Sequence, residues 1–316
     1  MTVARSSARA SGGDGPPPPR HSGVVACLGR TNVGKSTLLN QLLGQKLAIV
    51  SHKPQTTSRR VRGIVNAPGG QAVIVDTPGL HAAEKAINRS LLREARAALG
   101  GADAILAVTD PDATRHPAEE ALLRDLVRES RLPAVLALNK SDLLEGAAAN
   151  RLVEAERAGG SWAGVVGVSA RTGRNLDRLL GALLAALPVG EPLHPEDLLS
   201  DQPEREFFAE IIREQIFNAL HQELPYSAAV VIEDVAEEME PRHRYRIRAT
   251  IYVERDSQKG IIIGEGGSAL RRIGEGARRA IEDLTGAPVY LGLWVKVRRN
   301  WTKDERSLRA FGFERG

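Results

Sequence analysis

The sequence has very little cysteine, the residue that forms the disulfides of small secreted proteins and binds the metal in many zinc proteins. Its 316 residues include a single cysteine, Cys27. One cysteine excludes an internal disulfide and any zinc site built on cysteines. Cys27 lies in an apolar run, which favours a small buried hydrophobic residue. We therefore expect a reducing compartment, the cytoplasm.

Long apolar runs and a strong excess of one charge are also missing. No run approaches the ~18 apolar residues of a membrane span, and the N-terminal segment lacks an apolar signal core. The chain has 43 basic and 39 acidic residues, a net charge of +4. So mild a balance does not by itself indicate nucleic-acid binding, although a local patch can.

The length allows two ordinary domains, and proline marks where they separate. Residues 1–22 are rich in Ala, Arg, Ser and Gly and include the run Pro16–Pro19, so they cannot bury a core. A second group of prolines prevents a helix between 188 and 203. We predict a disordered tail over 1–22, a first domain over 23–187, a linker over 188–203 and a second domain over 204–316.

The first domain alternates between strand and helix patterns. Continuous apolar runs at 104–108 and 134–138 are typical of strands buried on both faces of a parallel sheet. Shorter runs at 24–28, 64–65, 72–75 and 165–168 predict further strands, and helices are predicted near 88–100, 117–129 and 175–187. This order predicts a doubly wound α/β fold, which binds ligands at the carboxyl ends of its strands.

A phosphate-binding loop follows the first predicted strand. The run Gly29-Arg30-Thr31-Asn32-Val33-Gly34-Lys35-Ser36 matches the pattern G-x-x-x-x-G-K-S/T, and a helix is predicted from Thr37. In this geometry backbone N–H groups and the helix N-terminus converge on phosphate. Lys35 would reach the β- and γ-phosphates, and the Ser36 hydroxyl would bind Mg²⁺.

Three short motifs follow later strands and specify the nucleotide. In Asp76-Thr77-Pro78-Gly79, Asp76 can hold Mg²⁺ through a water, and the Gly79 N–H can meet the γ-phosphate. In Asn139-Lys140-Ser141-Asp142, the Asp142 carboxylate can accept two hydrogen bonds from guanine, a pair that adenine does not offer. In Ser169-Ala170-Arg171, the Ala170 N–H can meet guanine O6. The motifs together predict GTP and GDP rather than ATP.

These motifs resemble the Ras-like translation-factor class of GTPases. The resemblance places a first switch at 54–60 and puts Thr57 on Mg²⁺, where Thr57, Asp76 and Gly79 would serve catalysis. From spacing alone Thr56 fits nearly as well. One departure is Leu80, which stands where Ras has a water-orienting glutamine. Leu80 has no donor or acceptor, so we expect slow hydrolysis, with the water positioned by backbone, ions or a partner; the next residue, His81, is interpreted as a polar switch residue.

The second domain has a different pattern. A helix is predicted over 204–223, strands near 226–232 and 245–253, then two helices ending near 284 and a strand over 289–299. In 245–253 apolar residues alternate with Arg244, Arg246 and Arg248, which predicts one core face and one basic face. The order helix-strand-strand-helix-helix-strand is that of the type II KH module.

The loop between those two helices satisfies the G-x-x-G pattern of KH domains, which clamp about four nucleotides. It comprises Gly264-Glu265-Gly266-Gly267 after Ile263. The stretch from 271 to 309 contains ten Lys or Arg residues and five Asp or Glu residues. Glu265 would repel phosphate, so we expect backbone contacts from the loop and positive charge from its neighbours. The predicted RNA-binding residues are the loop with Ile263, and the cations Arg271, Arg272, Lys296 and Arg298.

A GTPase domain followed by a type II KH domain resembles the Era family of bacterial ribosome-assembly GTPases. The similarity covers nearly everything beyond residue 22; its motifs include Asn32–Asn40, Pro54–Thr57, Asp76–His81 and Leu293–Val297. The resemblance implies binding to the 3′ end of small-subunit ribosomal RNA, help in maturing the small ribosomal subunit and peripheral association with the inner membrane. We expect a monomer. The alternative is an RNA-binding chaperone in which nucleotide is mainly structural.

Overall fold

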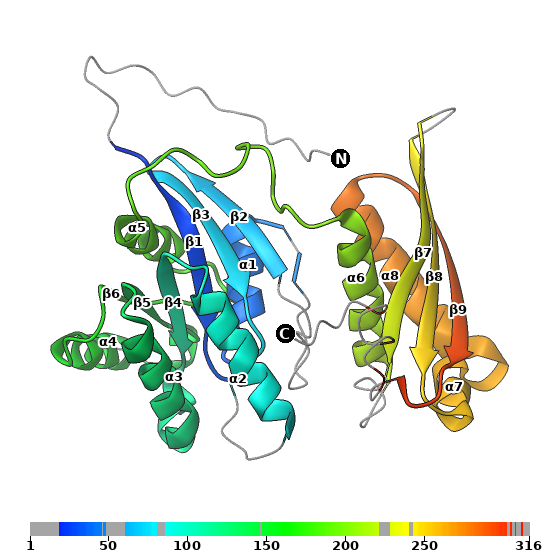
Figure 1. Ribbon diagram of the computed structural model, residues 1–316, viewed down its shortest axis with the longest axis horizontal. Coiled ribbons are helices and arrows are strands. Elements are labelled where there is room, and N and C mark those ends of the chain that lie inside the picture. Colours follow the sequence, from blue (N-terminus) through cyan, green and yellow to red (C-terminus); the bar gives the residue numbers. More distant parts are fainter. Residues whose placement is uncertain are drawn as a thin grey trace. The chain divides into compact units, whose positions relative to one another are not determined.

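The computed structural model describes residues 19–45, 47–48, 61–80, 86–145, 147–220, 228–239 and 243–301, together with residues 304, 307 and 311. The chain forms two compact units; the first takes most of the chain up to Asp201, and the second takes the chain from Gln202 onward. Each unit is drawn as a separate group of layers in Figure 1. Among the described residues, no helix combines the length and the apolar character needed to cross a membrane.

A mixed sheet forms the centre of the first unit. Its strand order is β2-β3-β1-β4-β5-β6. Strand β2 runs antiparallel to β3, and the other pairs are parallel. The strands are β1 (His21–Leu28), β2 (Val61–Ala67), β3 (Gly70–Asp76), β4 (Ala104–Thr109), β5 (Ala134–Leu138) and β6 (Gly164–Gly167). Every residue of β3, β4 and β5 is buried, as continuous apolar runs predict for central strands.

Helices cover both faces of this sheet (Figure 1). They are α1 (Lys35–Leu43), α2 (Ala86–Leu99), α3 (Pro117–Ser130), α4 (Ala148–Ala158) and α5 (Leu176–Ala186). All but α4 are predicted from the sequence. Helix α4 carries little apolar periodicity because Val153 is its one buried side chain. The doubly wound fold is confirmed, with β2 as an added antiparallel edge.

The second unit has the predicted order of elements. They are α6 (Glu204–Ala219), β7 (Ala229–Glu238), β8 (Arg244–Val253), α7 (Asp256–Ile263), α8 (Ser268–Thr285) and β9 (Val289–Val297). The sheet order is β7-β8-β9, with β7 antiparallel and β9 parallel to β8. Apolar residues of α6 and α8 pack with the inner face of this sheet into one core. Helix α6 ends at Ala219, four residues before the predicted end.

The outer face of β8 carries the predicted arginines, and acidic residues of β7 balance their charge. Arg244 and Arg246 pair with Glu238 of β7, and Arg248 pairs with Asp234. These acidic partners balance the arginines, which a single-strand pattern does not reveal. Further along the strand Thr250 is buried. The outer face of β8 therefore carries ion pairs at the end with the arginines, and its other end is buried at Thr250.

Residues 188–201 form no helix, as the prolines predict, and they are attached to the first unit. The Ser22 N–H donates to Pro188 O, and the Ile64 N–H of β2 donates to Leu199 O at 2.8 Å. The buried Gln71 side chain bonds both backbone groups of His194, at 2.8 and 2.9 Å. This segment therefore has fixed partners on β2 and β3, and does not behave as a free tether.

Candidate functional site

The loop between β1 and α1 has the conformation that phosphate binding requires. Gly34 has a φ of 98°, and a Cβ there would lie 2.4 Å from Nδ2 of Asn139. A Cβ at Gly29 would lie 2.3 Å from Val108 O. Both positions therefore exclude a side chain. Lys35 bends back over the loop and donates to Gly29 O at 2.9 Å and to Arg30 O at 3.0 Å.

Asp76, at the end of β3, lies fully buried beside this loop. The Ser36 hydroxyl donates to its Oδ2 at 2.6 Å. Its Oδ1 is buried and, within the described part of the chain, has no hydrogen-bond partner. Burial raises the pKa of Asp76, an effect that the Lys35 charge opposes, and burial lowers the pKa of Lys35. A buried carboxylate with a free oxygen next to a hydroxyl is a donor set that suits Mg²⁺.

Among the described residues, no group of three or more histidine, cysteine or acidic side chains gathers as an all-protein metal site would require. Mg²⁺ is usually held by one or two carboxylates, with phosphate and water supplying the other ligands. The pair of Ser36 and Asp76 fits that pattern. Thr56, Thr57 and His81 lie outside the described residues, so their roles stay predictions.

The segment after Asp76 packs directly against the phosphate loop. The Thr77 hydroxyl donates to Cys27 O at 2.6 Å, and the Leu80 N–H donates to Gly29 O at 3.0 Å. A Cβ at Gly79 would lie 2.6 Å from the Cα of Thr31, so only glycine fits there. The Leu80 side chain is buried in the apolar core. It is a packing residue, which explains why a hydrophobic side chain follows the motif.

Asn139 connects the phosphate loop to the last motif. Its Nδ2 donates to Val33 O at 2.7 Å, and its Oδ1 accepts the Ala170 N–H at 2.9 Å. The Ala170 N–H, which we predicted to meet guanine O6, is therefore also the donor of a hydrogen bond to Asn139. Of the other predicted nucleotide residues, Thr37 lies in the first turn of α1, and the rest lie in the segments that follow the strands: Thr31, Asn32, Val33, Pro78, Lys140, Ser141 and Ser169.

The Asp142 carboxylate, at the fourth position of its motif, lies beside two donors. Hydrogen bonds from the Ser169 side chain and then from Arg171 lower the pKa of Asp142. The Arg171 guanidinium donates to Oδ2 at 2.6 and 3.1 Å. The group is therefore ionised at neutral pH, as an acceptor of two guanine hydrogen bonds must be.

Asp110 is a site residue that sequence reasoning missed. It follows β4, is 1% exposed, and accepts hydrogen bonds from the Arg30 guanidinium and from Lys140 Nζ, the latter at 2.7 Å. It thereby joins the second residue of the phosphate loop to the second residue of the guanine motif. Its position in the sequence could have revealed it, because a polar residue directly after a buried strand of a doubly wound sheet lies at the edge where ligands bind.

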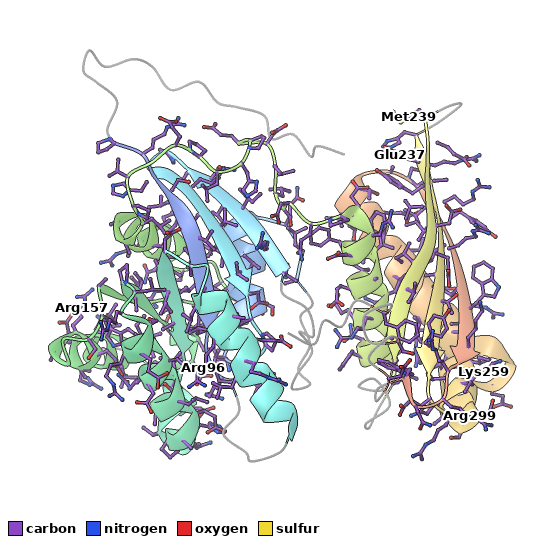
Figure 2. The ribbon with its side chains drawn as sticks, in the orientation of Figure 1. Arg96, Arg157, Glu237, Met239, Lys259 and Arg299 are labelled. Carbon is purple, nitrogen blue, oxygen red and sulfur yellow. The ribbon has the colours of Figure 1, made fainter. Side chains whose placement is uncertain are left out.

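The second unit presents a groove next to the G-x-x-G loop. Gly264, Gly266 and Gly267 have φ values of 74°, 57° and 80°, which side chains rarely adopt. A groove of about 410 Å³ runs between α8 and β9. Its walls comprise Gly267, Leu270, Arg271, Gly274, Glu275, Arg278, Leu291 and Leu293. Figure 2 shows Lys259 of α7 and Arg299 at the end of this unit where α7 lies.

The four predicted RNA-binding cations occupy different positions. Arg271 lines the groove. Arg272 donates to Ala219 O at 2.7 Å and so caps the end of α6. The Arg298 guanidinium lies 5.2 Å from the Phe311 ring centre, and Lys296 is exposed on β9. Ile263 is half-buried against the core, whereas Glu265 is exposed on the loop.

Comparisons with known proteins identify the family. A family model described as a 50S ribosome-binding GTPase matches residues 24–140, and one described as a KH domain matches residues 223–302. GTPase Era of Heliobacterium modesticaldum is 42% identical over 294 residues, which cover 93% of this chain and 97% of the relative. The chain belongs to the Era family of GTPases. GTPase Era of Syntrophus aciditrophicus is 45% identical over 92% of this chain and 95% of that relative.

Two solved Era structures share the fold of this family member. One is a variant of Aquifex aeolicus Era bound to GDP and AlF₄⁻, and the other is Era with MgGDPNP and nucleotides 1506–1542 of 16S ribosomal RNA. Each has a TM-score of 0.84 and 38% identity, and covers 93% of this chain and 99% of its own. The predicted family, fold class and GTPase activity are thus confirmed.

Proposed function

We propose that this chain is a GTP-dependent switch that binds the 3′ end of small-subunit ribosomal RNA and assists maturation of the small ribosomal subunit. The proposal rests on the observation that one chain contains both a nucleotide-binding set of motifs and a groove suited to RNA. The first unit gathers phosphate-loop, magnesium and guanine motifs at one sheet edge, and the second has a G-x-x-G loop beside a groove. An Era relative has been seen with both MgGDPNP and 16S ribosomal RNA.

In the nucleotide site the phosphates lie in the loop Gly29–Ser36, where Lys35 supplies the positive charge. Ser36, and Asp76 through a water, would hold Mg²⁺, with Thr57 or Thr56 as a further ligand. When bound, the ion offsets the negative charge that develops on the transferred phosphoryl group. The Gly79 N–H approaches the γ-phosphate because residue 79 carries no side chain.

Guanine is recognised by Asp142, and Asn139 positions the loop around it. The ionised Asp142 accepts hydrogen bonds from guanine N1–H and the N2 amino group. Asn139 contributes by fixing the phosphate loop and Ala170 in one arrangement. Because Asn139 uses both ends of its amide on backbone groups, its role here is to position the site.

Hydrolysis is slow because the position after Asp-x-x-Gly offers no polar group to the attacking water. Leu80 packs into the core rather than toward the loop. Orientation of the water therefore comes from backbone groups, ions or a bound partner. This arrangement suits a switch, whose active state must last long enough to be used.

The RNA site is the groove beside Gly264–Gly267. The loop contributes backbone contacts, and Arg271 in the groove wall supplies positive charge. Arg272 is assigned to fold stability because it caps α6.

Charge reversal on α8 tests this assignment. Arg271→Glu should weaken binding of an RNA matching the 3′ end of 16S ribosomal RNA by roughly tenfold or more at fixed salt. Arg279→Glu is the matched control, since Arg279 is exposed on the same helix outside the groove. Fluorescence anisotropy over a salt series would measure both, and equal losses for the two variants would count against the groove.

The resemblance to Era also supports a cytoplasmic monomer that associates peripherally with the inner membrane. Sedimentation of the purified chain and fractionation of cells with and without small subunits would test these points. Recovery in the membrane fraction only while ribosomal particles are present would argue against direct membrane contact.

A further inference from the structure

Two aromatic side chains are exposed on the outer face of the second unit. Tyr290 is 69% exposed and Trp294 is 48% exposed, whereas the other aromatic side chains among the described residues are buried or half-buried. Both belong to β9 and are four residues apart, so they lie on the same face of the sheet. This is the face opposite the helices α6 and α8, because Val289 and Val295 of β9 belong to the core.

Gly292 lies between them and lets the two rings form one surface. A Cβ at Gly292 would lie 2.8 Å from a ring carbon of Trp294, so the indole extends over this residue toward Tyr290. Glycine inside a strand is destabilising and often marks a close approach. Here the close approach is that of an indole ring lying along its own strand.

Two arginines of β8 flank this surface. The register of β8 and β9 places Arg246 opposite Tyr290 and Arg248 opposite Gly292. Arg248 pairs with Asp234 at 3.1 Å and Arg246 with Glu238 at 3.6 Å, yet both side chains stay more than half exposed. The acidic partners hold the guanidinium groups at the sheet surface and balance their charge. The two arginines therefore offer planar groups for stacking with their charge balanced, while Lys296 is exposed on the same face of β9.

The chain closes the other end of the same face with its own aromatics. Phe311 stacks on Tyr252 with the ring centres 4.5 Å apart, and Trp301 packs edge-on against Phe311. Tyr290 and Trp294 have no such cover from the described residues.

We propose that Tyr290 and Trp294 form a second RNA-contacting surface that stacks unpaired bases leaving the groove. This inference rests on the proposed RNA binding. Strand β9 is the edge strand of its sheet, and its Leu291 and Leu293 form a wall of the groove. RNA that passes over this edge therefore reaches Tyr290 and Trp294 directly.

The chemistry of the surface favours RNA over a protein partner. Exposed aromatic rings on a sheet stack single-stranded bases in other RNA-binding folds, and stacking tolerates many sequences. A G-x-x-G loop clamps about four nucleotides, whereas the RNA in the Era complex spans nucleotides 1506–1542. An RNA of that length needs protein contacts beyond the groove.

Two RNAs of different length separate this surface from the groove. A five-nucleotide RNA from the 3′ end of 16S ribosomal RNA is short enough for the groove alone, whereas an RNA of nucleotides 1506–1542 also reaches the outer face. In the variant with Tyr290→Ala and Trp294→Ala, affinity for the long RNA should fall about tenfold or more. Affinity for the short RNA should stay within about twofold of the unaltered chain. The variant with Tyr290→Phe and Trp294→Phe keeps both rings and should restore most of the lost affinity.

Each other outcome overturns the proposal in a recognisable way. Unchanged affinity for the long RNA excludes stacking on this face. Equal losses for both RNAs indicate a damaged groove. Normal binding of the long RNA together with weaker binding to small ribosomal subunits assigns the face to a protein partner. If the unaltered chain binds neither RNA, the proposed function itself fails, which the other outcomes do not imply.

Discussion

Asp110 connects two loops that are far apart in the sequence. It pairs with Arg30, 80 residues earlier, and with Lys140, 30 residues later. Arg30 is almost completely buried, and Glu120 approaches its Nε at 3.9 Å. A buried guanidinium needs a nearby anion, because an unpaired buried charge is strongly destabilising. The Asp110 carboxylate therefore helps to set the relative position of the phosphate and guanine loops, together with the bond from Asn139 to Val33 O.

Asp110→Asn tests this positioning role. Asparagine keeps the shape but removes the negative charge that Arg30 and Lys140 share, so the two loops lose their common anchor. We expect the free energy of unfolding to fall by about 3 kcal/mol, and the affinity for GDP to fall about tenfold or more. Calorimetry measures the affinity, and denaturant unfolding measures the stability. Asp112→Asn is the control, since that side chain is exposed nearby; wild-type GDP affinity in Asp110→Asn would exclude the positioning role.

The Glu282 carboxylate on α8 makes the stability of the second unit fall as the pH becomes acidic. The backbone N–H of Val289, and then Arg278, donate hydrogen bonds to Glu282, and they lower its pKa. A group whose pKa is lower in the folded state contributes stability above its unfolded value of about 4.3 and loses it as pH falls through the folded value.

Glu282→Gln should therefore flatten the acid side of the stability profile. We expect the variant to be less stable than the unaltered chain at pH 7, with the difference shrinking as pH falls below about 4. Urea unfolding at a series of pH values measures this. Asp283→Asn provides a neighbouring control, and a stability difference in Glu282→Gln that stays constant across the series would contradict the role of Glu282.

At the scale of elements, the segment 188–201 is held by the side chain of Gln71. This buried amide bonds His194 through both its oxygen and its nitrogen, and also Asn66 at 2.8 Å. Since Gln71 lies in β3, which ends at Asp76, the segment is fixed to the strand that carries the magnesium motif.

Gln71→Ala should detach this segment. Removing the amide leaves the part-buried backbone groups of His194 without this partner, which costs about 1–3 kcal/mol of unfolding free energy. Thermal and denaturant unfolding measure the loss, and hydrogen exchange should rise at residues 194–199. Arg62→Ala serves as control because its bond to Asp201 is exposed and water can replace it. Equal losses from both variants would show that burial of Gln71 is not the cause.

Patterns confined to one element were predictable from the sequence, whereas pairings between elements were not. The apolar runs that became β4 and β5 and the glycine-lysine loop before α1 carry their own signals. The alternation of core residues and arginines along β8 was predicted, but the acidic partners of Arg246 and Arg248 lie on another strand and could not be. The bond from Arg272 to the end of α6 is another pairing between elements that the sequence does not reveal.

At the scale of the whole molecule, the nucleotide and RNA sites lie in two separate units of one chain. Each unit has its own core, so each site can form without the other. Coupling between two sites requires that one ligand bind two states of the protein with different affinity. We expect the nucleotide to be the selector, because GTP and GDP differ by the γ-phosphate, which the proposed site brings close to Gly79.

We therefore expect the affinity for the 16S 3′-end RNA to differ between nucleotide states by about 5- to 150-fold, the usual range of allosteric coupling. Fluorescence anisotropy at fixed salt, with GDP or a non-hydrolysable GTP analogue, measures the ratio. Linkage requires that RNA change the affinity for the GTP analogue relative to GDP by the same factor, which gives an independent check. The Asp142→Asn variant should no longer bind GTP. Its affinity for the RNA should then be the same whichever nucleotide is added. Equal RNA affinities in both nucleotide states would instead favour a chaperone whose nucleotide only stabilises the first unit.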